Sequence, residues 1–125
     1  MRMTLLFIAL LVLSPLRPAA GQQRSADEQA VRQLIQATGA ALNARDYGAA
    51  AAVFAEDGDV ILPRSRRVSG QPAIRAFWQE TWSGAPAERR IALTVRSLRF
   101  LGSDVAIADC TAEFTAGEPT RSIYL

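Results

Sequence analysis

The apolar residues in the first half of the chain recur at helical intervals. Between residues 25 and 42, one face of a helix would carry Val31, Leu34, Ile35, Thr38 and Leu42. This spacing is typical of an amphipathic helix that packs one face on a core. Ser25 stands three residues before Glu28, which is the spacing of a capping box. We therefore expect the helix to begin at Ser25.

A second, shorter helix is predicted just after residue 46. Asp46 is a suitable N-cap, and the alanine run Ala49–Ala52 has high helix propensity. Gly58 ends this segment and turns the chain into a strand over Val60–Leu62, which Pro63 terminates.

A third helix follows a loop that carries Arg64, Arg66 and Arg67. Gly70 and Pro72 mark its start, since proline is tolerated in the first turn. Its predicted apolar stripe consists of Ile74, Phe77, Trp78, Thr81 and Trp82.

From residue 91 onward, apolar and polar residues alternate. Ile91, Leu93 and Val95 share one face, and the phase slips near Ser97, which predicts a β-bulge. Turns near residues 102–104 and 117–119 separate further strands over 105–112 and 121–125. The fold class expected is α+β, with three N-terminal helices packed in the concavity of a strongly bent antiparallel sheet, a cone-like barrel.

The first 21 residues are typical of a signal peptide, which leaves residues 22–125 as one domain. An apolar run from Thr4 to Leu13 is too short to span a bilayer, and small residues at positions 19–21 form a cleavage site. An uncleaved membrane anchor is the less favoured alternative. We expect the mature protein to be secreted or periplasmic, with no stable membrane anchor.

The charge balance argues against a nucleic-acid partner. The full chain has 14 arginines and 12 acidic residues. Cleavage before Gln22 would remove Arg2 and Arg17 but no acid, so 14 − 2 = 12 positive charges would face 12 negative ones. A neutral chain lacks the basic surface on which nucleic-acid binding depends.

The candidate chemistry is limited. Because the sequence has no histidine, acid–base chemistry would fall to a carboxylate, a tyrosine or Cys110. Cys110 shares a predicted strand face with two alanines, which favours a small buried hydrophobe over a nucleophile. The acidic residues at positions 56, 57 and 59 lack the pattern of a calcium loop, and the arginines near residue 65 are typical of a solvated surface. We expect no metal and no cofactor.

Three motifs resemble the SnoaL-like group of the nuclear transport factor 2-like superfamily. They are Asn43-Ala44-Arg45-Asp46, Phe54-Ala55-Glu56-Asp57, and Val68-Ser69-Gly70 followed by Ala73–Trp78. The resemblance runs from Ser25 to the end and implies a cone-shaped fold around one apolar pocket, as in secreted domains of unknown function. Members usually end in two long paired strands, so it also implies that a final strand is missing after Leu125. An open strand edge would make a homodimer one option.

Between Leu42 and Trp78 the chain is also similar to ketosteroid isomerase. That resemblance places Leu62 at the carboxylate base, Thr38 at the catalytic tyrosine and Ile123 at the catalytic aspartate. Leucine accepts no proton, and threonine is too weak an acid to replace a phenol. We therefore do not expect steroid isomerisation.

Two functions remain open. The first is binding of a small apolar molecule without chemistry, in a pocket lined by Thr38, Leu42, Phe54, Leu62, Phe77 and Trp78. The second is an isomerase, cyclase or hydrolase that uses Asp109, with Glu113 as a further candidate, as general acid or base. Arg96 or Arg99 would then assist from the neighbouring strand. Catalysis requires the Val105 face to point inward, where burial would raise the carboxyl pKa. We expect that face to point outward, which favours binding.

Overall fold

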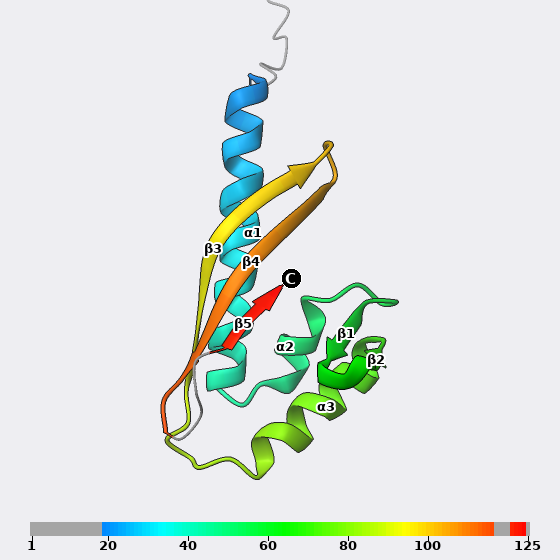
Figure 1. The fold of residues 1–125 in the computed structure, drawn as a ribbon, viewed down its shortest axis with the longest axis vertical. Coiled ribbons are helices and arrows are strands. Elements are labelled where there is room, and N and C mark those ends of the chain that lie inside the picture. The colour runs from blue at the N-terminus through cyan, green and yellow to red at the C-terminus, as the bar shows by residue number, and fades with distance from the viewer. Residues whose placement is uncertain (1–18, 117–120, 125) are drawn as a thin grey trace, which may run out of the picture.

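The computed structural model describes residues 19–116 and 121–124, and shows an α+β fold (Figure 1). The elements in chain order are α1 (Ala20–Asn43), α2 (Tyr47–Ala52), β1 (Asp59–Leu62), the 3₁₀ turn η1 (Pro63–Ser65), β2 (Arg66–Ser69), α3 (Gln71–Ser83), β3 (Ile91–Leu101), β4 (Val105–Phe114) and β5 (Arg121–Tyr124).

The strands form two antiparallel sheets. β1 pairs with β2, and the second sheet has the order β3-β4-β5. Helix α1 lies along the long β3–β4 hairpin, while α2, α3 and the β1–β2 hairpin form a lobe at one end (Figure 1). The predicted closed cone is not seen in the described residues, because each short strand of the lobe pairs only with the other and the two sheets remain separate.

The predicted bulge in β3 is confirmed. Val95 pairs with Cys110 and Ser97 with Asp109, so the register shifts by one residue between them. The shift returns Leu98 to the half-buried face of Val95. A single inserted residue thus keeps one face of the bent strand apolar along its length.

Helix α1 begins at Ala20, so the prediction of a start at Ser25 is wrong. Ser25 lies inside the helix, and the Gln22 side chain instead accepts a hydrogen bond from the Ala19 backbone N–H at 3.3 Å. The extra turn is anchored by Arg24, whose guanidinium lies 4.2 Å from the centre of the Phe100 ring and donates to the Gly102 carbonyl. This tertiary contact outweighs the local capping signal.

The segment Arg66–Ser69 is a strand, where the sequence pattern predicted a loop. Val60 pairs with Val68, and Arg67 forms an ion pair with Asp59 across the hairpin at 3.0 Å. Val68 is the single apolar residue of this strand and is buried, which explains why its periodicity is too weak to detect in the sequence.

Three clusters of buried residues form the core. The first contains Leu42, Ala50, Trp82, Ile91 and Ala112; the second contains Ile35, Ala108 and Cys110; the third contains Ala51, Val68 and Ile74. Two residues expected in the core are exposed, namely Leu34, which is 48% exposed, and Thr81. The buried face of α1 therefore follows Ile35, Thr38 and Leu42, with Leu34 at its edge.

The predicted signal peptide falls mainly on residues 1–18, outside the described residues. Within the described part of the chain, no helix is both long and apolar enough to cross a membrane.

Candidate ligand site

The motif Asn43-Ala44-Arg45-Asp46 joins the helices to the strand layer. The Asn43 side-chain amide donates to the Ile91 carbonyl at 2.9 Å and accepts from the Ile91 N–H at 2.8 Å. The Asp46 carboxylate accepts from the Ala49 N–H at 2.9 Å and caps α2, as predicted. These are structural tasks, which explains why the motif marks the fold rather than a reaction.

Arg45 in the same motif packs on the core. Its guanidinium carbon lies 4.7 Å from the centre of the Trp82 ring, and its Nη2 donates to the Pro86 carbonyl at 3.0 Å. Its φ of 61° turns the chain between α1 and α2. The cation–π contact holds this turn against the buried end of α3.

Four of the six predicted pocket residues lie together. Phe54, Leu62, Phe77 and Trp78 are partly buried and pack against the third cluster of Ala51, Val68 and Ile74. We call these seven residues the apolar cluster. The ring centres of Phe77 and Trp78 are 4.9 Å apart. The side chains converge from the end of α2, from β1 and from α3.

The other two predicted pocket residues lie on α1. Leu42 is 1% exposed and belongs to the first cluster with Trp82 and Ile91. Thr38 is buried, and its hydroxyl donates to the Leu34 carbonyl at 2.9 Å. Trp78 belongs to the apolar cluster and also packs against the first cluster, so its indole connects the two groups of predicted pocket residues.

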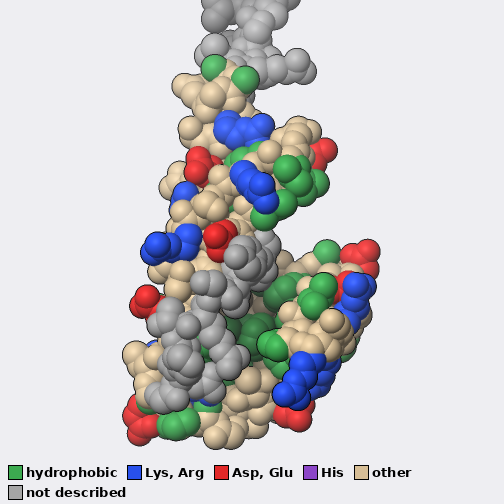
Figure 2. Space-filling model, in the orientation of Figure 1, with side chains coloured by type: hydrophobic (Ala, Val, Ile, Leu, Met, Phe, Trp, Pro, Cys, Tyr) green, Lys and Arg blue, Asp and Glu red, His purple; other side chains and the backbone are tan. Residues whose placement is uncertain are grey.

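The surface beside the lobe is hollowed. Figure 2 shows a hollow next to the lobe that holds α3, β1 and β2, with hydrophobic side chains on its floor. The four outer residues of the apolar cluster are only partly covered by protein, so some of their apolar surface remains open to solvent.

The indole N–H of Trp78 is a buried polar group beside the apolar cluster. The Trp78 Nε1 is shielded from solvent and makes no hydrogen bond in the described structure. Indole N–H groups are donors only, and buried ones usually find an acceptor. The donor is therefore an unused hydrogen-bonding group at the junction of two apolar clusters.

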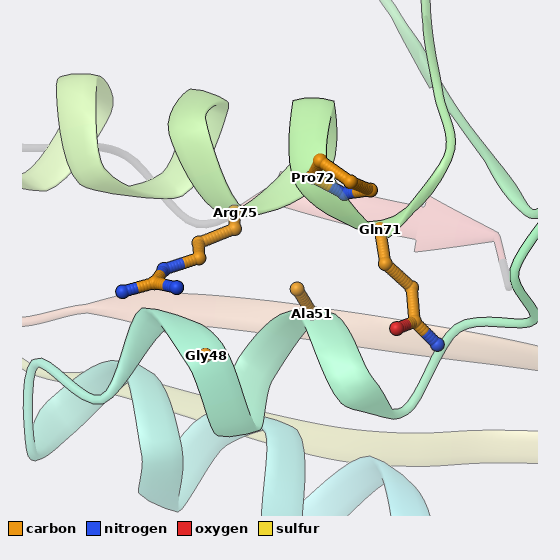
Figure 3. Close-up of a pocket in the computed structure, with 5 residues that line it drawn as sticks. All are labelled: Gly48, Ala51, Gln71, Pro72 and Arg75. Carbon is orange, nitrogen blue, oxygen red and sulfur yellow. The ribbon is translucent and has the colours of Figure 1, made fainter.

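Two grooves lie on the surface of the lobe. The first, of about 440 Å³, is lined by Gly48, Ala51, Gln71, Pro72 and Arg75, with Gln71 and Arg75 extending from α3 toward α2 (Figure 3). The second, of about 320 Å³, is lined by Arg66, Arg67, Val68, Ser69, Ala73, Ala76, Phe77 and Glu80. Only Phe77 among the predicted pocket residues lines either of them, so neither groove coincides with the predicted pocket.

Asp109 and Glu113 lie on the face of β4 opposite its buried residues. Ala108, Cys110 and Ala112 are buried against the core, whereas Asp109 is half-buried and Glu113 exposed. Within the described chain, no ion pair joins Asp109 to Arg96 or Arg99. The strand thus directs both carboxylates away from α1 and the first two clusters.

Cys110 is fully buried, as predicted. Burial raises the pKa of its thiol, and the neighbouring Asp109 carboxylate raises it further, while Arg32 acts in the opposite direction. A thiol that stays protonated inside a core is a poor nucleophile.

The positions that correspond to the catalytic groups of ketosteroid isomerase carry either an apolar side chain or a hydroxyl that is already hydrogen-bonded. Leu62 is half-buried in the apolar cluster, and the Thr38 hydroxyl donates a hydrogen bond to the Leu34 carbonyl of its own helix. Ile123 pairs with Cys110 through β5, and its side chain lies outside the described atoms.

Sequence reasoning missed Gln71, whose side chain donates to the Phe54 carbonyl at 2.7 Å and ties α3 to the end of α2.

Comparisons with known proteins agree with this fold. Residues 23–118 match the model of the SnoaL-like domain. A domain of unknown function with a cystatin-like fold from Nostoc punctiforme is 25% identical, with a TM-score of 0.68 over 78% of this chain and 61% of that one. This chain therefore spans about three fifths of that protein's length.

Two further solved structures share the fold. A protein from Catenulispora acidiphila is 21% identical, with a TM-score of 0.68 over 82% of this chain and 80% of that one. A computationally designed 17-OHP binder is 21% identical, with a TM-score of 0.50 over 73% of this chain and 72% of that one. A search of curated proteins gives no match.

Proposed function

Because the chain belongs to the SnoaL-like domain family, we propose that it binds a small apolar molecule against the apolar cluster, without chemistry of its own. The observation that carries the proposal is the partial burial of Phe54, Leu62, Phe77 and Trp78 around one hydrophobic centre. A ligand that covers these side chains removes apolar surface from water, which contributes roughly 2.5 kcal/mol for every 100 Å² covered.

The surroundings of the cluster support the same proposal. The hollow beside the lobe has a hydrophobic floor (Figure 2), and the groove of about 320 Å³ also reaches Val68 and Phe77. Concave, mostly apolar surfaces with a few polar groups are the usual setting for small-molecule binding. The designed 17-OHP binder is a precedent for small-molecule binding by a protein of similar fold.

Catalysis by Asp109 is the less favoured function. Its side chain lies on the strand face that carries Val105, which is 54% exposed, whereas Trp78 packs against the cluster that contains Ala112, on the opposite face of β4. A ligand bound against the apolar cluster would not lie on the same side of β4 as this carboxylate.

We also propose that the protein acts outside the cytoplasm, after export. The apolar run Thr4–Leu13 and the small residues at positions 19–21 support this part of the proposal. Intact mass of the exported protein is expected to show Gln22 as the first residue, and a retained Met1 would contradict export with cleavage.

The binding proposal can be tested with the neutral apolar dye N-phenyl-1-naphthylamine and two variants of one strand. In β1, Leu62 belongs to the apolar cluster, whereas Ile61 points to solvent and is 66% exposed. Leu62→Asn is expected to weaken dye binding by about tenfold or more, because a desolvated amide replaces apolar surface. Ile61→Asn is the matched control and should leave binding within twofold. Absence of saturable binding, or equal loss in both variants, would overturn the proposal.

A further inference from the structure

Trp78 provides a polar group that the proposed function leaves unexplained. Its Nε1 is buried and unpartnered in the described structure, although its ring packs between two apolar clusters. The two part-buried amides of this region bond elsewhere, since Asn43 pairs with the backbone of Ile91 and Gln71 donates to the Phe54 carbonyl. The surrounding side chains also shield the atom from solvent in this conformation.

An isolated buried donor is costly unless something supplies an acceptor. The aromatic neighbour Phe77 and the aliphatic Leu62 carry no side-chain acceptor. Both are only partly buried, so a molecule that covers them would lie next to the Trp78 ring, whose centre is 4.9 Å from that of Phe77. A bound molecule with one carbonyl oxygen could therefore satisfy the indole while the rest of it covers the apolar cluster.

We propose that the ligand is an apolar molecule with a single carbonyl acceptor, whose oxygen accepts a hydrogen bond from Trp78 Nε1. This inference rests on the proposed binding function and specifies the chemical class of the ligand. A site that provides one donor among apolar side chains discriminates strongly, because a ligand without the acceptor leaves that donor unpaired.

The test compares two ligands of nearly equal shape, trans-decalin and trans-2-decalone, on the wild-type chain and on Trp78→Phe. The variant keeps an aromatic ring and removes the N–H together with the pyrrole part of the indole. The ratio of decalone affinity to decalin affinity is expected to fall about fivefold to tenfold in the variant. The ratio is the readout, because the smaller ring changes the affinity for both ligands alike. A ratio that does not change would overturn the inference.

The wild-type chain provides a second readout that does not depend on the variant folding. It contains two tryptophans, so a ¹H–¹⁵N spectrum of the full chain shows two indole signals, and nuclear Overhauser contacts with the neighbouring Phe77 ring identify that of Trp78. Decalone is expected to move the Trp78 indole proton downfield, and decalin to leave it close to its free position. A signal already at a hydrogen-bonded position without ligand would contradict the inference.

The two proposals fail in different ways. Saturable decalin binding with no response of the Trp78 indole to decalone would overturn the carbonyl inference alone. No binding of either ligand would overturn both this inference and the proposed function.

Discussion

The side-chain amide of Asn43 forms two hydrogen bonds with the backbone of Ile91, at 2.9 and 2.8 Å, across 48 residues of sequence. It pairs with the first residue of β3 much as a neighbouring strand would. The end of α1 is thereby fixed to the strand layer, at a buried residue of the first cluster. The lobe that carries the apolar cluster begins only a few residues later, so this link helps to position the proposed site.

Asn43→Ala is expected to lower the free energy of unfolding by about 1–3 kcal/mol, because the buried backbone groups of Ile91 lose their partners. Urea unfolding measures the change. Gln36→Ala, at an exposed position of the same helix, is the matched control and should change stability by less than about 0.5 kcal/mol. Equal stability of the Asn43 variant and the control would show that the two hydrogen bonds do not hold the helix to the strand.

Asp46→Ala is expected to cost about 1 kcal/mol of stability, because the first turn of α2 loses the carboxylate that accepts from Ala49. Asp46→Ser should retain most of that stability, since serine is also a good cap. Thermal unfolding of the three proteins checks the order wild type, serine variant, alanine variant. An alanine variant as stable as the wild type would contradict the capping role.

The buried thiol of Cys110 predicts a loss of stability at alkaline pH. Its pKa is raised by burial and, further, by Asp109, so the folded chain keeps the proton after the unfolded chain has released it. The unfolded state binds fewer protons above about pH 8.5, and stability must fall as the pH rises through that range.

The matching control is Cys110→Ala, which has no thiol to titrate. Under reducing conditions, the free energy of unfolding of the wild type should fall relative to that of Cys110→Ala as the pH rises from 7 to 9.5. Urea unfolding at several pH values measures this shift. A difference that does not vary with pH would show that the thiol has the same pKa in the folded and unfolded chains.

Asp109→Asn is expected to leave dye binding within twofold, because the carboxylate lies on the face of β4 opposite the buried Ala108 and Cys110. Glu113→Gln should behave in the same way. Fluorescence titration with the dye measures both. A loss of fivefold or more in Asp109→Asn alone would place this carboxylate in the site and revive the catalytic alternative.

The sequence predicted those elements whose signals are local and strong. Asp46 caps α2, Gly70 with a φ of 82° is the N-cap of α3, and the slip of periodicity at Ser97 marks the bulge. Each signal is a property of a short segment, namely a side chain that can cap, a glycine in a left-handed conformation or a change of phase.

The errors arose where tertiary contacts decide the outcome. The extra turn of α1 depends on Arg24 reaching Phe100 and Gly102, far away in the sequence. β2 depends on pairing with β1, because its own pattern contains one apolar residue. The closed cone would depend on sheet contacts that are not formed among the described strands.

The candidate site was predicted in part. The sequence indicated the apolar residues of the lobe, because two local patterns reveal them. These are the helical spacing of apolar residues on α3 and the short apolar strand that ends at Leu62. It did not indicate that Trp78 joins two clusters with an unpartnered indole N–H, since the partners of one atom depend on the packing of several elements. Nor did it indicate that the Thr38 hydroxyl would donate a hydrogen bond to the Leu34 carbonyl of the same helix.

The most direct test of the proposed function is to locate a bound apolar molecule by nuclear Overhauser contacts. With trans-decalin added to the isotopically labelled chain, we predict contacts between ligand protons and the side chains of Phe54, Leu62 and Phe77. Contacts confined to the exposed Leu101 and Val105 at the far end of the β3–β4 hairpin, or no contacts at saturating ligand, would contradict binding at the apolar cluster.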